Sequence, residues 1–266
     1  MTTPTLHIDF ETRSVLDLKE VGLWNYARHP STDVWCMAWA FGEDEPEVWV
    51  PGSHGPLPDV TGKVQVIAHN APFELEIWNE IMARRYGWPT LHPEQTYCTL
   101  AQCYAMGLPG GLEDAALALG LPVLKDTEGR TLMLRLARPR RIDPDGSVVW
   151  WDDPDKIARL HAYCQQDVRV ERELHKRLLP LGAKERKVWL MDYAINQRGV
   201  AVDLETAKAG ATMAEEVKVR AGQRLAIITE ATVTSADALT PLKQWIELRV
   251  GYPVSSLAKD MVEAML

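Results

Sequence analysis

Four short apolar segments near the N-terminus constrain the fold of this chain more than any other feature. They are rich in β-branched and aromatic residues and are separated by turn-forming residues, a pattern typical of β-strands. The segments span residues 5–10, 34–41, 47–50 and 64–69. Helical patterns interleave with them and follow them, so we expect one α/β domain over residues 1–182.

Helix-starting signals mark the remainder of that domain. Pro72 suits the first turn of a helix, because its missing N–H would have no partner there. Asp153, a favourable N-cap residue, precedes Pro154 and opens the longest expected helix. Shorter helices are expected near residues 100–106 and 112–121, on either side of a glycine-rich break.

The last part of the chain, residues 183–266, consists of amphipathic helical patterns. We therefore expect an all-α C-terminal extension as a second domain. Its final residues, AKDMVEAML, are still helical in pattern. The chain is thus expected to be either a truncated form of a longer protein or a short natural relative of one.

Composition excludes several classes of protein. Hydrophobic residues make up 46% and charged residues 25% of the 266 positions, close to the average for globular chains and unlike disordered, collagenous or coiled-coil proteins. No apolar run approaches the roughly 20 residues of a membrane span, and Asp9 and Glu11 lie where a signal peptide would be apolar. We expect a soluble cytoplasmic protein with no membrane partner.

Charge is unevenly distributed. Residues 1–182 hold 18 Lys and Arg against 26 Asp and Glu, whereas residues 183–266 hold 11 of each, so the net charge of −8 belongs to the first part. An acidic domain repels nucleic acid at long range. Binding of nucleic acid would therefore need bound cations or a local basic patch, and residues 125–141 form such a patch, with six basic residues against two acidic ones.

The first strand carries two carboxylates on one face. Asp9 and Glu11 are two residues apart, and side chains at that spacing share a face of a strand. Like charges this close repel each other unless a cation lies between them. Acidic pairs at a strand end are a common way to hold a hard divalent ion, although a solvated strand face explains this pair alone more simply.

A third carboxylate follows a later strand. Glu74 lies four residues after Asn70, just inside the helix that Pro72 opens, where the helix dipole favours a negative charge. The plainer interpretation is a helix-terminal glutamate with Glu76 and Glu80 as solvated companions.

A fourth carboxylate lies on the long helix. Asp167 and Tyr163 are four residues apart and share a mostly apolar helix face. An aspartate in such a face needs a cation or a hydrogen-bond donor, so it either holds an ion, bonds to the tyrosine or lies at the surface.

Together these segments match, in order and spacing, the three exonuclease motifs of the DEDD superfamily. The tyrosine four residues before Asp167 resembles the tyrosine subclass, because the histidine subclass has its histidine where this chain has Ala162. The stretches LHIDFETRS, NYARHP, VWCMAWAF and AHNAPFE are similar to the proofreading domain of bacteriophage-type family A DNA polymerases. Beyond Ala183 the chain is similar to the start of the polymerase thumb, and no polymerase catalytic motif precedes Leu266.

The resemblance implies a fold, an activity and a set of site residues. The fold is a ribonuclease H-like α/β fold, a mixed sheet flanked by helices. The activity is 3′→5′ exonucleolytic hydrolysis of single-stranded or frayed DNA 3′ ends with two Mg²⁺ or Mn²⁺ ions, next to a polymerase domain in cis in a longer parent chain. The implied catalytic residues are Asp9, Glu11, Glu74, Tyr163 and Asp167, of which the four acids hold the metal ions and the tyrosine orients the water.

Other residues are implied to contact the DNA. Thr12, Asn70 and Phe73 are expected at the terminal nucleotide. The arginines of the basic patch, Arg138, Arg140 and Arg141, are expected along the single strand. Trp150 and Trp151 are expected either to stack on a base or, more simply, to pack in the core.

One departure from the family pattern concerns the second metal ion. Most family members have Asp where this chain has Glu74, a change more compatible with action through water than with direct ligation. Two alternatives remain: an RNA-trimming relative of ribonuclease D type, which shares the tyrosine subclass, and a catalytically silent DNA-binding domain, of which Glu74 would be a sign. The four cysteines lack a matched histidine pair for zinc and are expected to be small apolar fillers.

Overall fold

The structure is a computed structural model that describes residues 3–53, 58–122, 126–235 and 237–265. The chain divides into two compact units, residues 1–198 and residues 199–266. The division follows the first helix of the expected C-terminal extension rather than preceding it. No helix among the described residues is long and apolar enough to cross a membrane.

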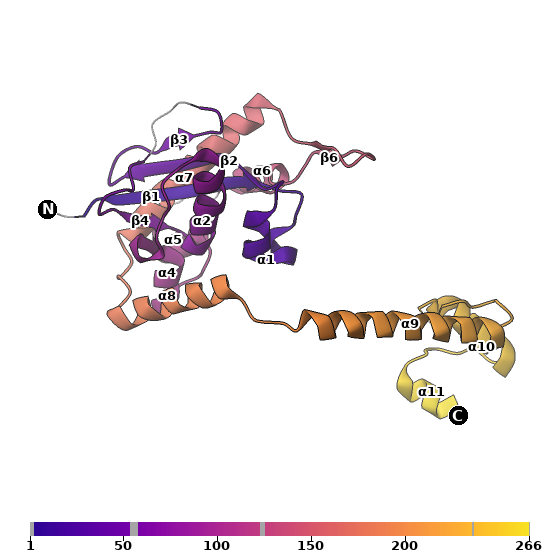
Figure 1. Ribbon diagram of the computed structural model, residues 1–266. Coiled ribbons are helices and arrows are strands. Elements are labelled where there is room, and N and C mark those ends of the chain that lie inside the picture. The colour runs from indigo at the N-terminus through magenta and orange to yellow at the C-terminus, as the bar shows by residue number, and fades with distance from the viewer. Residues whose placement is uncertain (1–2, 54–57, 123–125, 236, 266) are drawn as a thin grey trace. The chain divides into compact units, whose positions relative to one another are not determined.

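A mixed five-stranded sheet forms the centre of the first unit, with helices on both faces (Figure 1). The strand order is β3-β2-β1-β4-β5. β1 is antiparallel to β2 and parallel to β4, β2 is antiparallel to β3, and β4 is parallel to β5. The strands are β1 (Thr5–Arg13), β2 (Asp33–Phe41), β3 (Glu47–Trp49), β4 (Gln65–Ala68) and β5 (Thr96–Cys98). The α/β class and the four expected strands are confirmed.

Helices of the first unit follow the expected positions, with additions. Those expected from the sequence are α2 (Ala71–Ile77), α4 (Thr99–Ala105), α5 (Leu112–Ala118), α7 (Pro154–His175) and α8 (Ala183–Arg198). The π-helical turn η1 (Trp78–Ala83) continues the helix that Pro72 opens. The additions include α1 (Leu18–Arg28), α3 (Arg84–Tyr86), the 3₁₀ turn η2 (Pro93–Gln95) and α6 (Thr127–Leu136). α1 bends at Gly22, whose φ of 74° is accessible to glycine at little cost.

β1 is the central strand, and its side chains point alternately to the two faces of the sheet. Leu6, Ile8 and Phe10 point into a large apolar core that also contains residues of α2 and η1. Asp9 and Glu11 alternate with them and lie opposite Ala38 and Cys36 of β2. α7 covers this second face, packing against both β1 and β2.

Local signals fix the two helices that matter for the site. Asn70 precedes α2 in a left-handed conformation, with φ of 63°, and Pro72 occupies the first turn. Asp153 caps α7 as expected, accepting a hydrogen bond from the backbone N–H of Lys156. Because β1 and β4 are parallel, their carboxyl ends meet at one edge of the sheet, and the start of α2 lies there.

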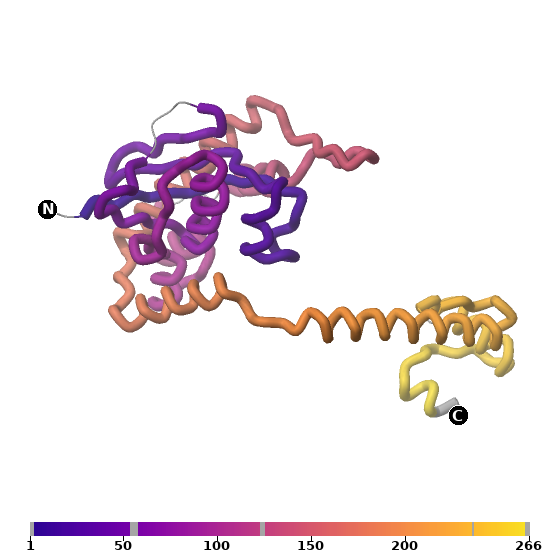
Figure 2. Tube along the Cα trace, in the orientation of Figure 1, coloured from indigo at the N-terminus to yellow at the C-terminus, as the bar shows by residue number. Residues whose placement is uncertain are grey.

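A short hairpin connects α6 to α7. β6 (Arg141–Ile142) pairs antiparallel with β7 (Val148–Val149), and the hairpin projects away from the sheet (Figure 2). The sequence did not reveal these strands, which are only two residues long.

The second unit is entirely helical among its described residues, as expected. It contains α9 (Leu204–Ile228), α10 (Leu239–Val250) and α11 (Lys259–Met265). Asp203 caps α9 by accepting hydrogen bonds from the N–H groups of Glu205 and Thr206. Its small interior includes Thr229, Val233 and Val254, all less than 4% exposed.

Candidate active site

The expected catalytic residues line one cavity of about 490 Å³ in the first unit. β1, α2 and α7 each contribute, although the residues span more than half of that unit's sequence. The cavity is lined by the five expected catalytic residues, Asp9, Glu11, Glu74, Tyr163 and Asp167, and by Thr12, Asn70, Phe73 and Arg138 from the expected substrate-binding set. Arg140 and Arg141 lie elsewhere, at the base and the first strand of the hairpin.

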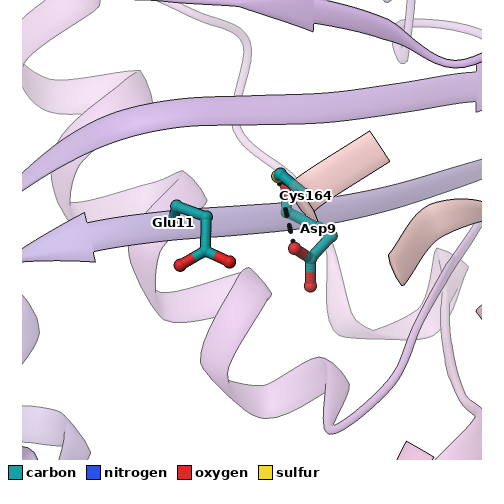
Figure 3. A group of neighbouring side chains, drawn as sticks. All are labelled: Asp9, Glu11 and Cys164. Atoms are coloured by element: carbon teal, nitrogen blue, oxygen red, sulfur yellow. Dashed lines mark hydrogen bonds between the residues drawn. The ribbon is translucent and has the colours of Figure 1, made fainter. Parts of the chain in front are cut away.

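Asp9 and Glu11 project side by side from β1 (Figure 3). A ligand oxygen of each lies within 4.8 Å of the other and of the Cys164 sulfur. The register of β1 against β2 shifts between Glu11 and Thr12. The extra residue at this irregularity, Trp35, is on β2. Glu11 and Thr12 both line the cavity.

Glu74 enters the cavity from the first turn of α2. Its side chain is 3% exposed, and its Oε2 atom has no hydrogen-bond partner among the described residues. Burial raises its pKa well above the usual range, and the nearby charge of Asp9 raises it further. A buried carboxylate oxygen without a partner is costly unless a cation or a proton compensates it.

Tyr163 and Asp167 enter from α7. Burial raises the pKa of Asp167 to about 8, with a further contribution from Asp9, while a hydrogen bond from Tyr163 opposes the shift. The pKa of the Tyr163 hydroxyl is raised by burial and by the charges of Asp167 and Glu11. The tyrosine is therefore protonated at neutral pH and acts as a hydrogen-bond donor.

The pKa values of both acids on β1 are raised as well. Burial raises the pKa of Asp9 to about 7 despite a hydrogen bond from Cys164. The pKa of Glu11 is raised well above its usual range by burial and then by Asp9. Clustered carboxylates with raised pKa values are typical of functional sites.

These groups fit hard divalent metal ions. Four carboxyl side chains line the cavity, and the group with ligand atoms within 4.8 Å of one another includes Asp9 and Glu11 but not Glu74 or Asp167. One buried oxygen of Glu74 lacks a partner among the described residues, and oxygen is the ligand that Mg²⁺ and Mn²⁺ prefer. The Cys164 thiol belongs to the same group of neighbours, but burial raises its pKa well above the usual range. A neutral thiol is a poor ligand for such ions and a suitable donor to Asp9.

A polar and aromatic wall adjoins the acids. The Thr12 hydroxyl lies 2.9 Å from the Tyr26 hydroxyl, and the Tyr26 and Phe73 ring centroids are 6.5 Å apart. Asn70 makes no capping hydrogen bond with its side chain and is exposed at the cavity. Backbone strain at a left-handed asparagine is often kept where a side chain must face a ligand.

The arginines of the basic patch lie in different parts of the first unit. Arg138 lines the cavity and pairs with Asp17 at its rim. Arg141 forms an ion pair of 2.7 Å with Asp143 within the hairpin, and the nearest oxygen of Asp152 is 3.7 Å from Arg140.

Trp150 and Trp151 serve the packing around the hairpin. Trp150 stacks against the Arg13 guanidinium, and Trp151 stacks against Arg135 and donates its indole N–H to the carbonyl of Arg138. The plainer of the two sequence interpretations, packing rather than base stacking, agrees with these contacts.

Comparison with known proteins finds sequence similarity to a DNA polymerase. The chain is 32% identical over 279 aligned residues to a DNA polymerase of Bacillus phage SP02. The chain is similar to a phage DNA polymerase. The alignment covers 98% of this chain and 41% of that polymerase, so the chain spans about two fifths of the polymerase's length. No family model matches the chain.

Some residues that line the cavity were not identified from the sequence. Tyr26 and the apolar residues Leu16, Leu18, Met133 and Leu134 line the cavity. They come from α1, the loop before it, and α6, and these helices were not expected as cavity walls. Tyr26 lies within the quoted stretch NYARHP, which was a signal for it.

One sequence interpretation is wrong. Glu76 and Glu80 are not solvated companions of Glu74 but are 3% and 8% exposed. The Arg28 guanidinium lies 3.0 Å from Glu76 and 2.8 Å from Glu80, and the Tyr193 hydroxyl of α8 donates to Glu76 at 2.8 Å. The arginine pairs with both buried carboxylates, and Arg84 provides a second cation for Glu80. Arg28 comes from α1, which the sequence did not predict.

Proposed function

We propose that this chain is a metal-dependent 3′→5′ exonuclease of the DEDD superfamily, tyrosine subclass, with a ribonuclease H-like first unit. The substrate would be a single-stranded or frayed DNA 3′ end, and the products nucleoside 5′-monophosphates. The observation that supports this most is the convergence of four carboxyl groups and one tyrosine from three elements in one cavity. Similarity to a phage polymerase favours DNA and a proofreading role in a longer parent chain.

The acids would hold the metal ions. Asp9, Glu11 and Asp167 would be the direct ligands, and Glu74, with its unpartnered oxygen, would complete the set. Bound divalent ions supply an activated water and neutralise charge on the scissile phosphate and the leaving 3′ oxygen. Their positive charge also offsets the repulsion of DNA by an acidic domain.

Other side chains of the protein would orient the attacking water and bind the DNA. The Tyr163 hydroxyl, held by Asp167, would donate a hydrogen bond that orients the attacking water. Thr12, Tyr26 and Phe73 would bind the terminal nucleoside, with the aromatic rings available for stacking on its base. Arg138, at the rim, would contact a backbone phosphate.

A direct test uses 5′-labelled single strands of DNA and of RNA with the same sequence. With Mg²⁺ or Mn²⁺, the wild type should shorten the DNA from its 3′ end in steps of one nucleotide, and a chelator should stop the reaction. Asp9→Ala should be inactive, while Asp155→Ala, an exposed aspartate on α7, should remain active. Faster digestion of RNA would favour the exoribonuclease alternative, and binding without digestion would favour a silent domain.

A further inference from the structure

Gly129 of α6 is in close contact with the side chain of Tyr163. Gly129 is buried, and a Cβ atom at this position would lie only 2.5 Å from Cδ2 of Tyr163. The same Cβ would lie 2.5 Å from Oδ2 of Asp126. Real Cβ atoms essentially never approach other atoms this closely. Glycine is therefore required for α6 to lie against the tyrosine ring as it does.

Asp126 fixes the N-terminus of α6 to α7. Its carboxylate accepts a hydrogen bond of 2.7 Å from the backbone N–H of Gly129, which caps the helix. Both of its oxygens also accept from Nη2 of Arg159, at 2.6 and 2.5 Å. Arg159 is one helical turn before Tyr163, so the ion pair and the glycine contact lie on the same face of α7.

The other end of α6 forms a wall of the cavity. Met133 and Leu134 line it, followed by Ala137 and Arg138. α6 therefore touches the site twice, at the tyrosine through its first turn and at the open cavity through its last. A substitution in the first turn of α6 would therefore displace the Tyr163 side chain by direct contact and would affect the four acids only indirectly.

We propose that Gly129 and the Asp126–Arg159 pair are positioning residues that hold the Tyr163 hydroxyl at its working place beside Asp167. This inference rests on the proposed exonuclease function. Tyr163 contributes by placing one hydrogen bond, and the value of such a contribution depends steeply on geometry, since a displacement of about 1 Å costs up to roughly 10²-fold in rate.

The primary test is Gly129→Ala in the full chain. Alanine is otherwise the better helix former, so a loss of activity reflects displacement of the Tyr163 ring or of the Asp126 carboxylate that the added Cβ would meet. We expect kcat to fall by about tenfold or more, with KM for a DNA strand and the Mg²⁺ concentration for half-activity nearly unchanged. Gly210→Ala is the matched control, because Gly210 is also helical and a Cβ there meets nothing within 4 Å. A tenfold loss in the control as well would overturn the proposal.

A double-mutant cycle separates positioning from general damage. In a Tyr163→Phe background the hydroxyl is already absent, so Gly129→Ala should cost less than about twofold further. Additive losses would mean that the glycine acts through something other than the hydroxyl, and the proposal would fail. Where Gly129→Ala does not fold, Arg159→Gln takes its place in the same cycle, with Arg159→Lys expected to restore part of kcat.

A spectroscopic readout does not depend on activity. In protein labelled with 3-fluorotyrosine, the ¹⁹F signal missing from Tyr163→Phe identifies Tyr163, and Gly129→Ala should shift that signal and leave the other tyrosine signals in place. An unmoved signal would overturn the positioning inference even in an active enzyme. A shifted signal in a wild type without nuclease activity would leave the contact intact and refute the proposed function instead.

Discussion

The sulfur of Cys164 lies 3.3 Å from the carboxylate oxygen Oδ2 of Asp9 and 3.4 Å from the backbone carbonyl oxygen of the same residue. The thiol is fully buried between α7 and the sheet, and its sulfur is within reach of the Glu11 carboxylate too. Its raised pKa makes it a hydrogen-bond donor to Asp9. The cysteine thus holds the first of the acids and does not itself provide a soft metal ligand.

Cys164→Ser should therefore retain most of the activity. A hydroxyl donates the same hydrogen bond, so we expect kcat with Mg²⁺ or Mn²⁺ to stay within about threefold of the wild type. The loss of one neutral hydrogen bond, at roughly 1 kcal/mol, would cost more than that. Cys103→Ser, at a buried cysteine in a different cluster, controls for the cost of a buried hydroxyl. Abolished activity in Cys164→Ser alone would show that the sulfur ligates the metal.

Stability without metal should fall as the pH rises. The pKa of Asp9 is raised to about 7 and that of Asp167 to about 8, chiefly by burial. Between about pH 4, where these groups titrate in the unfolded chain, and pH 7–8, the folded chain keeps protons that the unfolded chain has lost. The free energy of unfolding must decrease over that range.

Thermal unfolding in chelator measures this effect. The melting temperature should be higher at pH 5.5 than at pH 8.5, and Mg²⁺ should restore stability at pH 8.5, because bound ions replace the protons. The double variant Asp9→Asn, Asp167→Asn should show a smaller pH dependence. A pH dependence identical to that of the wild type would mean that these two groups do not titrate as described.

Arg28 is expected to be important for stability rather than chemistry. Arg28→Ala leaves the buried carboxylates of Glu76 and Glu80 without their shared cation. Removing one partner from a buried ion pair typically costs about 3–5 kcal/mol. Arg84→Ala is the control, since Arg84 binds Glu80 from a side chain that is 68% exposed, and exposed pairs contribute about 0–1 kcal/mol. Urea unfolding compares them, and equal losses would contradict the network.

Arg138 and Arg141 of the basic patch should differ in their contribution to DNA binding. Arg138→Ala should raise KM for single-stranded DNA and reduce the salt slope of binding by about one, the value for one lost phosphate contact. Arg141→Ala should change the slope less, because Arg141 lies on the hairpin strand β6 and does not line the cavity. Binding measured by fluorescence anisotropy at several salt concentrations tests both. Equal slopes for all variants would place the DNA path away from Arg138.

Much of the fold follows from local sequence signals. Four of the five strands of the sheet were predicted from runs of apolar residues, and α7 from the Asp153–Pro154 start signal, because these signals act within a few residues. The spacing of Asp9 and Glu11 likewise fixed their shared face. The convergence of these acids with Glu74 came from the family resemblance, not from any local pattern.

The remainder depends on tertiary contacts. Glu76 seemed solvated because its partner Arg28 is 48 residues away in the sequence, on a helix bent at Gly22. The contact of Gly129 with Tyr163 is equally invisible, since a glycine in a helical stretch gives no sign of what lies against it. Interactions between distant segments set these environments, and no periodicity encodes them.

The central claim is that four carboxyl groups form one binding site for divalent ions. Anomalous diffraction from crystals soaked in Mn²⁺ tests it most directly, because it locates the ions without requiring activity. We predict two peaks in the cavity, bounded by Asp9, Glu11, Glu74 and Asp167, and their disappearance in Asp9→Ala. An ordered cavity without any Mn²⁺ peak, at a concentration that saturates known metal-dependent nucleases, would contradict the account.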